Sequence, residues 1–271
     1  MIKDVLIKHG FRFNKKYGQN FITDGNLLES IVADSGVTKD DLVLEIGAGA
    51  GTLTEKIAEK AGKVISYEID ENLRPVLAET LAGAENVDVR FADFMKEKVS
   101  DLKKEFENCV VIANLPYYIT TPVIMRLLEN GLGKSITVMV QKEVADRLIS
   151  PPSNKDYGSI TVKVNLLGYA KITRTVSRYM FYPVPNVDSA IVKIERQEKY
   201  RGKDPDLTDE IVKRAFLMRR KTLVNNLTDY GSKEELAAYL QEAGIGANVR
   251  GETLSAEDFV RLSDVIKEKK R

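Results

Sequence analysis

The fold of this chain is decided by residues 41–51, which read DLVLEIGAGAG. Their apolar run predicts a buried strand ending in a glycine-rich turn, and we expect a helix to follow from about Thr52 to Ala61. Gly47 and Gly49 carry no Cβ, so the main chain can pass close to a ligand there. A strand, a glycine turn and a helix in this order indicate the nucleotide-binding start of an open α/β sheet. A turn with a purely structural role is the alternative.

The spacing of the glycines distinguishes between classes of nucleotide site. Gly47, Gly49 and Gly51 give G-x-G-x-G, whereas dinucleotide-binding enzymes use G-x-G-x-x-G, so the pattern disfavours NAD. The next predicted strand ends in Glu68, about 20 residues beyond the first glycine, where a carboxylate can accept hydrogen bonds from both hydroxyls of an adenosine ribose. A helix-capping carboxylate is the alternative for Glu68, and we assign capping to Asp70.

Another buried strand, predicted over residues 109–113, leads into Asn114-Leu115-Pro116-Tyr117. The polar Asn therefore lies at the carboxyl end of the sheet, where open α/β sheets bind ligands. Pro116 fixes φ and has no N–H, so the Leu115 carbonyl can be held outward as an acceptor beside the Asn114 amide oxygen. Two acceptors and the aromatic face of Tyr117 suit a planar base with an exocyclic amino group. A structural turn with packed Pro and Tyr is the alternative.

Three further segments contain candidate residues. A third predicted strand is followed by Asp93 and Phe94, and Asp93 is either a turn residue or an acceptor for an amino group. Residues 181–189, FYPVPNVDS, form a rigid extended loop that either presents Phe181 as a fixed wall or makes an aromatic core corner. Residues 11–22 mix basic and aromatic side chains, which suits contact with phosphates and unpaired bases or a solvated basic arm.

Composition limits the classes of function. With 43% hydrophobic residues among 271, the chain can bury a large core, and the charged stretch 197–205, with its Gly and Pro, indicates a linker between two domains. The pattern beyond this linker is helical only. One His and one Cys argue against a zinc site or a His-based nucleophilic triad. Cys109 lies in an apolar strand and no apolar run approaches the roughly 20 residues of a membrane span, so we expect a soluble, cytoplasmic protein without membrane contact.

The net charge gives no indication of a partner, because 41 Lys and Arg are balanced by 40 Asp and Glu. Basic residues nevertheless gather in an N-terminal and a downstream cluster: Arg12, Lys15 and Lys16, and Arg219, Arg220 and Lys221. Contact with RNA phosphates and a solvated surface are the two interpretations of these clusters.

Taken in their order along the chain, these motifs resemble those of one known family. The ribosomal RNA adenine N6,N6-dimethyltransferases of the small-subunit, 16S type have similar segments, which here are G-Q-N-F at 18–21, E-x-G-x-G-x-G at 45–51, N-L-P-Y at 114–117, F-x-P-x-P-x-V-D-S at 181–189 and R-R-K-T-L-x-N-N-L at 219–227. The resemblance covers nearly the whole chain. It implies an α/β fold with the mostly parallel, Rossmann-like sheet of methyltransferases that use S-adenosyl-L-methionine (SAM), an antiparallel edge hairpin and a small all-helical C-terminal domain.

The resemblance also implies roles for individual residues. The implied cofactor contacts are Asn20, Ile22, Glu45, Gly47, Gly49, Glu68, Asp93, Phe94 and Asn114. The implied catalytic residues orient and enclose the target adenine, and they are Asn114, Leu115, Tyr117 and Phe181. The implied RNA contacts come from both basic clusters: Arg12, Lys15, Lys16, Arg219, Arg220 and Lys221.

The implied activity is transfer of methyl groups from SAM to N6 of two adjacent adenines in the 3′-terminal hairpin of 16S-type ribosomal RNA. The product cofactor would be S-adenosyl-L-homocysteine, no metal would be required, and the reaction would be coupled to assembly of the small ribosomal subunit or its precursor. We expect a monomer with a catalytic domain over residues 1–198 and a helical RNA-docking domain over residues 206–271. Two alternatives stay open: a large-subunit adenine methyltransferase of the antibiotic-resistance type, against which residues 219–227 argue, and a non-catalytic ribosome-assembly factor that binds RNA.

Overall fold

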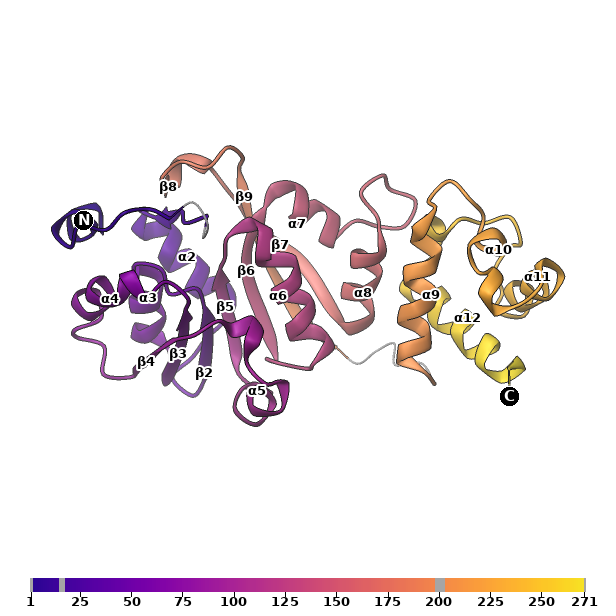
Figure 1. Ribbon diagram of the computed structural model, residues 1–271, viewed down its shortest axis with the longest axis horizontal. Coiled ribbons are helices and arrows are strands. Elements are labelled where there is room, and N and C mark those ends of the chain that lie inside the picture. The colour runs from indigo at the N-terminus through magenta and orange to yellow at the C-terminus, as the bar shows by residue number, and fades with distance from the viewer. Residues whose placement is uncertain (1, 15–17, 198–202, 271) are drawn as a thin grey trace. The chain divides into compact units, whose positions relative to one another are not determined.

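The two central motifs follow neighbouring strands of a seven-stranded sheet, whose order is β4-β3-β2-β5-β6-β9-β7 (Figure 1). The structure is a computed structural model that describes residues 2–14, 18–197 and 203–270. Strands β2 to β6 pair parallel, and β9 pairs antiparallel with β6, so the predicted mostly parallel sheet with an antiparallel edge is confirmed. The strands span Leu42–Ile46 (β2), Lys63–Glu68 (β3), Val87–Phe91 (β4), Val110–Asn114 (β5), Ser135–Gln141 (β6), Gly168–Val176 (β7) and Ser189–Arg196 (β9).

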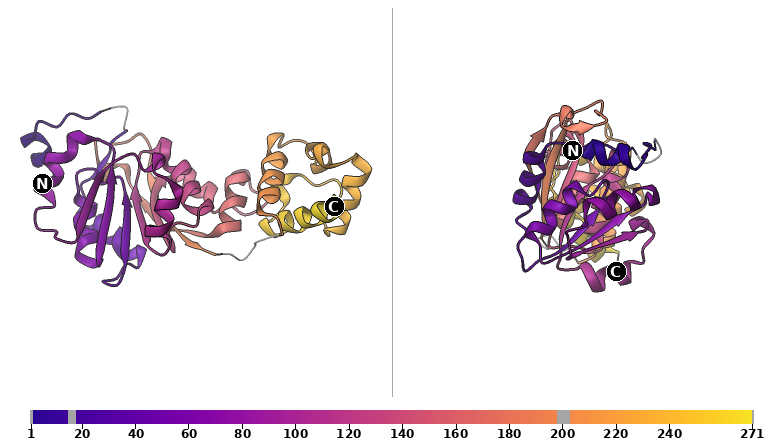
Figure 2. Two further views of the ribbon diagram at one scale, coloured as in Figure 1. Left: turned by 60° about the horizontal axis from the view of Figure 1, so that its bottom comes forward. Right: turned by 90° about the vertical axis from the view of Figure 1, so that its left-hand side faces the viewer.

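Helices cover both faces of this sheet (Figures 1 and 2). The helix after the glycine turn forms as predicted. Helix α2 is capped by Asp24, whose carboxylate accepts a hydrogen bond from the N–H of Leu27 at 2.8 Å. Within the described residues, no helix is both long and apolar enough to cross a membrane. The helices and 3-10 turns around the sheet are α1 (Ile2–Lys8), α2 (Gly25–Ser35), α3 (Thr52–Lys60), η2 (Glu71–Leu73), α4 (Arg74–Thr80), η3 (Phe94–Lys96), α5 (Val99–Phe106), α6 (Tyr117–Glu129), α7 (Lys142–Leu148) and η4 (Arg178–Met180).

The connections between strands place a switch point at β2 and β5. From β2 the chain adds β3 and β4 on one side, and then it crosses over to add β5 on the other side. Open α/β sheets bind ligands beside such a point, outside the carboxyl ends of the strands. A Cβ built on Gly47, which follows β2, would lie 3.2 Å from the carbonyl oxygen of Asn114, the last residue of β5. The glycine turn and the Asn114 motif therefore meet at one edge of the sheet.

Helix α1 at the N-terminus was not predicted from the sequence. Leu6 on this helix is buried in an apolar cluster with Leu73 and Leu77. The ammonium group of Lys8 lies 2.8 Å from the carboxylate of Glu79. Apolar packing and an ion pair therefore hold the start of the chain against η2 and α4.

Aromatic rings of the basic segment pack against one another. The Phe13 ring lies edge-on to Tyr182 and tilted against Phe21, with centroid distances of 5.4 and 5.6 Å. Strand β1 (Phe21–Ile22) pairs antiparallel with β8 (Phe181–Tyr182), which brings the two segments together. These rings are engaged in packing, so the expectation that they stack on unpaired bases has no support from their positions. Lys15 and Lys16 lie outside the described residues.

The chain divides into two compact units, Met1–Ala145 with Lys171–Arg196, and Asp146–Ala170 with Gln197–Arg271. The division after residue 196 falls close to the predicted linker, but residues 146–170, which we had placed in the catalytic domain, group with the C-terminal helices. The reason is apolar packing, because Tyr157 and Val162 are fully buried in the core of that second unit. Its helices are α8 (Ser159–Leu167), α9 (Pro205–Leu217), α10 (Leu223–Asn226), α11 (Lys233–Glu242) and α12 (Ala256–Lys269), with the 3-10 turns η5 (Thr228–Tyr230) and η6 (Gly251–Thr253).

Replacing Tyr157 by Phe should destabilise the second unit. The Tyr157 hydroxyl donates a hydrogen bond of 2.6 Å to the Leu254 carbonyl, and the variant leaves that buried acceptor without its donor. We expect the free energy of unfolding to fall by about 1 to 3 kcal/mol in denaturant titrations. Tyr169→Phe is the matched control, since Tyr169 is 55% exposed, and it should change stability little. Equal stability of both variants would show that the buried hydrogen bond contributes nothing.

Candidate active site

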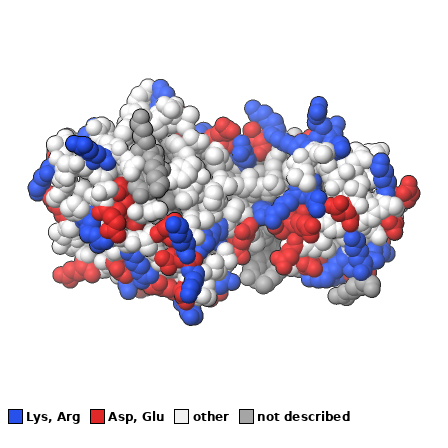
Figure 3. Space-filling model, viewed as in Figure 1, with Lys and Arg blue, Asp and Glu red and all other residues white. Residues whose placement is uncertain are grey.

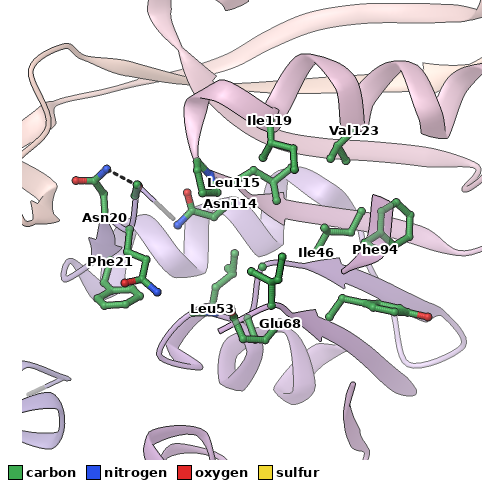
Figure 4. A pocket seen from close by; sticks show the side chains of 18 of the residues that line it. Asn20, Phe21, Ile46, Leu53, Glu68, Phe94, Asn114, Leu115, Ile119 and Val123 are labelled. Atoms are coloured by element: carbon green, nitrogen blue, oxygen red, sulfur yellow. Dashed lines mark hydrogen bonds between the residues drawn. The ribbon is translucent and has the colours of Figure 1, made fainter. Parts of the chain in front are cut away.

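The predicted motifs line one cavity at the carboxyl edge of the sheet. Figure 4 shows Ile46, Glu68, Phe94 and Asn114 around this space. Ile46, Glu68 and Asn114 are the last residues of β2, β3 and β5, and Phe94 begins η3 after β4. All predicted cofactor contacts except Glu45 line the cavity: Asn20, Ile22, Gly47, Gly49, Glu68, Asp93, Phe94 and Asn114. The predicted catalytic residues Leu115, Tyr117 and Phe181 line it as well.

The glycine turn has the predicted position, but the reason for its glycines differs from our expectation. Gly47, Gly49 and Gly51 have φ values of 88°, 57° and 83°, which residues with a Cβ rarely adopt. We expected a Cβ at Gly47 or Gly49 to occupy the space of a ligand. Instead it would meet protein, at 3.2 Å from the Asn114 carbonyl oxygen or at 3.2 Å from the Phe21 ring. Backbone conformation and packing therefore require glycine here.

Glu68 is buried, and its carboxylate holds the glycine turn in place. One oxygen accepts a hydrogen bond from the N–H of Gly49 and the other from the N–H of Asp70, each at 2.8 Å. Burial raises the pKa of the Glu68 carboxyl, and these N–H groups offset part of that rise. Because each carboxylate oxygen has more than one lone pair, both can still accept from a hydroxyl in the cavity. The predicted capping role of Asp70 is confirmed, since its side chain accepts from the N–H of Asn72 at 3.1 Å.

The loop over residues 18–22 is anchored beside these acids. The Gln19 amide donates a 2.7 Å hydrogen bond to the Asp70 carboxylate, and the Asn20 amide donates one of 3.1 Å to the Gly18 carbonyl. Gln19 lines the cavity, yet we had not assigned it a role. Its signal in the sequence was its place inside the G-Q-N-F segment, directly before Asn20, a residue of the predicted site.

Glu45 does not line the cavity, so the expectation of a direct cofactor contact lacks support. Side chains alternate between the two faces of a strand, and the next residue of β2, Ile46, is the one that lines the cavity. Glu45 is fully buried, and one carboxylate oxygen accepts hydrogen bonds from the hydroxyls of Thr54 and Ser66, both at 2.6 Å. Its other oxygen has no partner among the described residues. Burial raises the pKa of Glu45 to about 7.

Asp93 has the turn role that we had left open. Its carboxylate accepts a 3.0 Å hydrogen bond from the N–H of Met95 and so caps η3. The residue also lines the cavity, so its role as an acceptor for an amino group stays a prediction. Phe94 is buried, and its ring lies edge-on to Tyr67 with centroids 5.5 Å apart, which makes a firm apolar wall.

Tyr117 is fixed by a hydrogen bond and by the helix that it begins. Helix α6 starts at this residue, directly after Pro116 at its N-cap. The Tyr117 hydroxyl and the Ser189 hydroxyl lie 2.8 Å apart and share a hydrogen bond. Burial raises the pKa of the Tyr117 phenol, so it stays neutral. Its ring orientation is therefore set by β9, on which Ser189 is the first residue.

Two residues of α6 that line the cavity were not assigned a role from the sequence. Ile119 and Val123 lie four positions apart, on one face of the helix, and both line the cavity (Figure 4). A helix predicted from Tyr117 would have identified them. Phe181 is 4% exposed and packs in the core with Val176, as the core-corner interpretation requires. It also lines the cavity, and its role as a wall for a bound base stays a prediction. Among the described residues, no three His, Cys, Asp or Glu side chains are grouped so that they could hold a metal ion.

Comparison with known proteins agrees with this geometry. The family model described as ribosomal RNA adenine dimethylase matches residues 10–268. The chain belongs to this family. A relative from Streptococcus thermophilus (strain CNRZ 1066), named ribosomal RNA small subunit methyltransferase A, is 46% identical over 98% of this chain and 96% of its own length. A Bacillus licheniformis protein of the same name is 43% identical over 98% and 95% of the two chains.

Two solved structures with a similar fold bear on the substrate. A dimethyladenosine transferase from Plasmodium falciparum is 26% identical, with a TM-score of 0.78 and coverage of 89% of this chain and 95% of the other. The 23S rRNA methyltransferase ErmE is 28% identical, with a TM-score of 0.72 and coverage of 91% and 99%. The fold is therefore shared by the adenine dimethylase family and by an enzyme named for the other ribosomal subunit.

Arg219 in the family's R-R-K-T-L stretch is engaged inside the second unit. Its guanidinium donates hydrogen bonds to the carbonyls of Lys155 and Tyr157, both at 3.0 Å. The cluster lies on the turn after α9, and Arg220 and Lys221 are exposed there. Arg219 therefore holds the loop before α8, and its predicted contact with RNA has no support from this geometry.

The other described residues of the two basic clusters lie on a surface with charges of both signs (Figure 3). On the face shown in Figure 3, Lys and Arg side chains are mixed with Asp and Glu side chains. Arg12 is exposed, as are Arg220 and Lys221. Contact of these three residues with RNA remains a prediction that rests on their positive charge and their exposure.

The pKa of Glu45 predicts how stability depends on pH. A carboxyl whose pKa rises from 4.5 to about 7 on folding destabilises the folded state as pH increases through that range. Glu45→Gln keeps an acceptor for Thr54 and Ser66 and cannot ionise. At pH 8 the variant should therefore be more stable than the wild type by about 1 to 3 kcal/mol, and at pH 4 the difference should vanish.

Urea unfolding at both pH values measures this difference. Asp101→Asn, an exposed site whose side chain is 63% accessible, is the control and should show no such change between the two pH values. A Glu45→Gln variant with the same pH profile as the wild type would contradict the assigned pKa.

Proposed function

We propose that this protein transfers methyl groups from SAM to N6 of two adjacent adenines in the 3′-terminal hairpin of 16S-type ribosomal RNA. The product would be N6,N6-dimethyladenosine. The observation that carries the proposal is the position of Asn114, which lines the same cavity as the glycine turn and Glu68. Acceptors suited to an adenine amino group thus lie beside groups suited to the adenosine of a cofactor. The names of the relatives support small-subunit ribosomal RNA as the substrate.

The residues around the cavity fit the adenosine part of SAM. The Glu68 carboxylate suits the two ribose hydroxyls, and the Asp93 carboxylate suits the amino group of the adenine. Phe94 and Leu53 offer apolar surface for the ring, and Asn20 lines the cavity from the N-terminal loop. When bound, SAM supplies an electrophilic methyl group on a positively charged sulfur.

The chemistry at the target adenine is a problem of orientation. The N6 lone pair is delocalised into the ring, which makes the amino group a poor nucleophile. The Asn114 amide oxygen and the Leu115 carbonyl can each accept one N6–H, which favours a pyramidal nitrogen with its lone pair directed at the methyl donor. Neither acceptor blocks a methyl in place of a hydrogen, so a second transfer is possible. We assign no general base, because the proton can leave to water once the nitrogen is cationic.

Tyr117 and Phe181 enclose the base in this proposal. The hydrogen bond between Tyr117 and Ser189 fixes one ring before the substrate arrives. Phe181 is held by core packing on the pairing of β8 with β1. Stacking on such rings contributes roughly 1 to 3 kcal/mol per base, which offsets the cost of taking the adenine out of its stack.

We further propose that the enzyme acts as a monomer on the small ribosomal subunit or its assembly precursor. The sheet-containing unit would carry out catalysis, and the helical unit would dock on the RNA. The likeness to ErmE makes a large-subunit target the second candidate, since the fold alone does not distinguish the two. The identity of 43 to 46% with proteins named for the small subunit favours the first.

Nucleoside analysis distinguishes these functions. Small and large subunits that lack the modification are incubated separately with isotopically labelled SAM, and their nucleosides are identified by mass spectrometry. We expect labelled N6,N6-dimethyladenosine in the small subunit alone. Label in the large subunit would favour the second candidate, and RNA binding without any label would favour a non-catalytic assembly factor.

Asn114→Ala should separate catalysis from cofactor binding. Losing an acceptor that orients the amino group should lower methyl transfer by on the order of 100-fold or more, while SAM affinity stays within a few fold. Single-turnover transfer and calorimetric titration of SAM on one preparation measure the two effects. Near wild-type transfer would remove Asn114 from the mechanism.

Arg219→Ala should reduce stability, whereas Arg220→Ala should reduce RNA binding. Loss of the two carbonyl contacts of Arg219 should reduce the stability of the helical unit by about 1 to 3 kcal/mol. Arg220→Ala should leave stability unchanged and reduce the salt slope of subunit binding by about one. Denaturant unfolding and subunit binding at several salt concentrations measure both. A stable Arg219→Ala variant with a reduced slope would reverse the assignment.

A further inference from the structure

A groove that the proposed reaction does not use lies at the carboxyl end of β6. It is lined by polar and aromatic residues from the start of α7, from η4 and from the loop before β9: Lys142, Glu143, Arg178, Tyr179, Asn186 and Asp188. All of them belong to the unit that contains the catalytic cavity. The groove is therefore fixed to the same framework as the proposed adenine site.

Tyr179 presents its ring to the solvent in this groove. The side chain is 71% exposed, which is more than any other tyrosine or phenylalanine side chain among the described residues. The Arg178 guanidinium lies 5.0 Å from the ring centroid and donates a 3.0 Å hydrogen bond to the Tyr179 hydroxyl. It also donates to the Asn186 carbonyl at 3.1 Å. The ring is thus held in one orientation, although little apolar packing covers it.

The groove is next to the proposed adenine site along two segments of the chain. Tyr179 precedes Phe181, a wall of the catalytic cavity, by two residues, which corresponds to at most about 7 Å between their Cα atoms. Asp188 directly precedes Ser189, whose hydroxyl is bonded to Tyr117. The groove and the proposed adenine site are therefore joined by two short, ordered stretches of chain.

The chemistry of the groove suits a nucleotide better than a simple anion. Carboxylates of Glu143 and Asp188 line it together with the cations of Lys142 and Arg178, so it has no excess of positive charge. An exposed aromatic ring beside an arginine is a combination that stacks a base and contacts its phosphate. The Asp188 carboxylate is also occupied, since it accepts a 3.0 Å hydrogen bond from the backbone N–H of Arg178.

We propose that this groove binds the nucleotide next to the target adenine, with its base stacked on Tyr179 and its phosphate contacted by Arg178. The inference rests on the proposed function, because it assumes that RNA enters the neighbouring cavity. Tyr179 is then a positioning residue: it holds the strand in place while the adjacent base is methylated.

Three variants test this assignment: Tyr179→Ala, Tyr179→Phe and, as a matched exposed tyrosine outside the groove, Tyr169→Ala. Equilibrium binding to unmodified small subunits, methyl transfer and SAM affinity are measured on each preparation. Tyr179→Ala should weaken subunit binding roughly 5- to 100-fold, the range for loss of one stacked base. Tyr179→Phe keeps the ring and should stay within about threefold of the wild type, as should Tyr169→Ala, and SAM affinity should be unchanged in all three.

A second measurement locates the nucleotide. Subunits carrying an abasic nucleotide beside the target adenine should bind the wild type and Tyr179→Ala equally, because the stacking partner has been removed. Unchanged binding by Tyr179→Ala, an equal loss in Tyr179→Phe, or a persisting difference on abasic subunits would each overturn the proposal. If the wild type binds subunits but transfers no methyl group, the proposed function fails, and the binding comparison still decides whether the groove contacts RNA.

Discussion

The structure depends on the close approach of two parallel strands, β2 and β5, at the switch point of the sheet. A Cβ on Gly47 would lie 3.2 Å from the Asn114 carbonyl oxygen, a tight contact, and the positive φ of Gly47 also favours glycine between the turn after β2 and the end of β5. The buried Glu68 carboxylate then holds the same turn from the side of β3, through the N–H of Gly49. These constraints bring the glycine turn and the Asn114 motif, separated by more than sixty residues in sequence, into one cavity.

Residues at strand ends were the part of the site that the sequence could predict. A buried strand followed by a polar residue places that residue at the carboxyl edge, and Glu68, Asp93 and Asn114 all line the cavity there. Glu45 does not line the cavity. A family motif gives position along a strand but does not state which face each residue takes. The alternation of the strand turns Glu45 toward Thr54 and Ser66.

Contacts between distant segments could not be predicted from local patterns. Tyr157 is buried among C-terminal helices by packing with residues far along the chain. Arg219 donates a hydrogen bond to the carbonyl of Tyr157, in the loop before α8. A basic residue in a charged cluster has the same local signature whether it contacts RNA or two carbonyl groups of its own chain. For the same reason the aromatic residues near the N-terminus resembled a nucleic-acid surface, whereas Phe13 packs against Phe21 and Tyr182.

A crystal structure with sinefungin, a stable analogue of SAM, tests most directly whether one cavity serves both cofactor and target base. The account predicts that the ribose hydroxyls bind the Glu68 carboxylate, that the adenine lies beside Asp93 and Phe94, and that the amine replacing the transferable methyl faces the Asn114 side chain. Binding of the analogue away from Glu68, or with this amine directed away from Asn114, would contradict it.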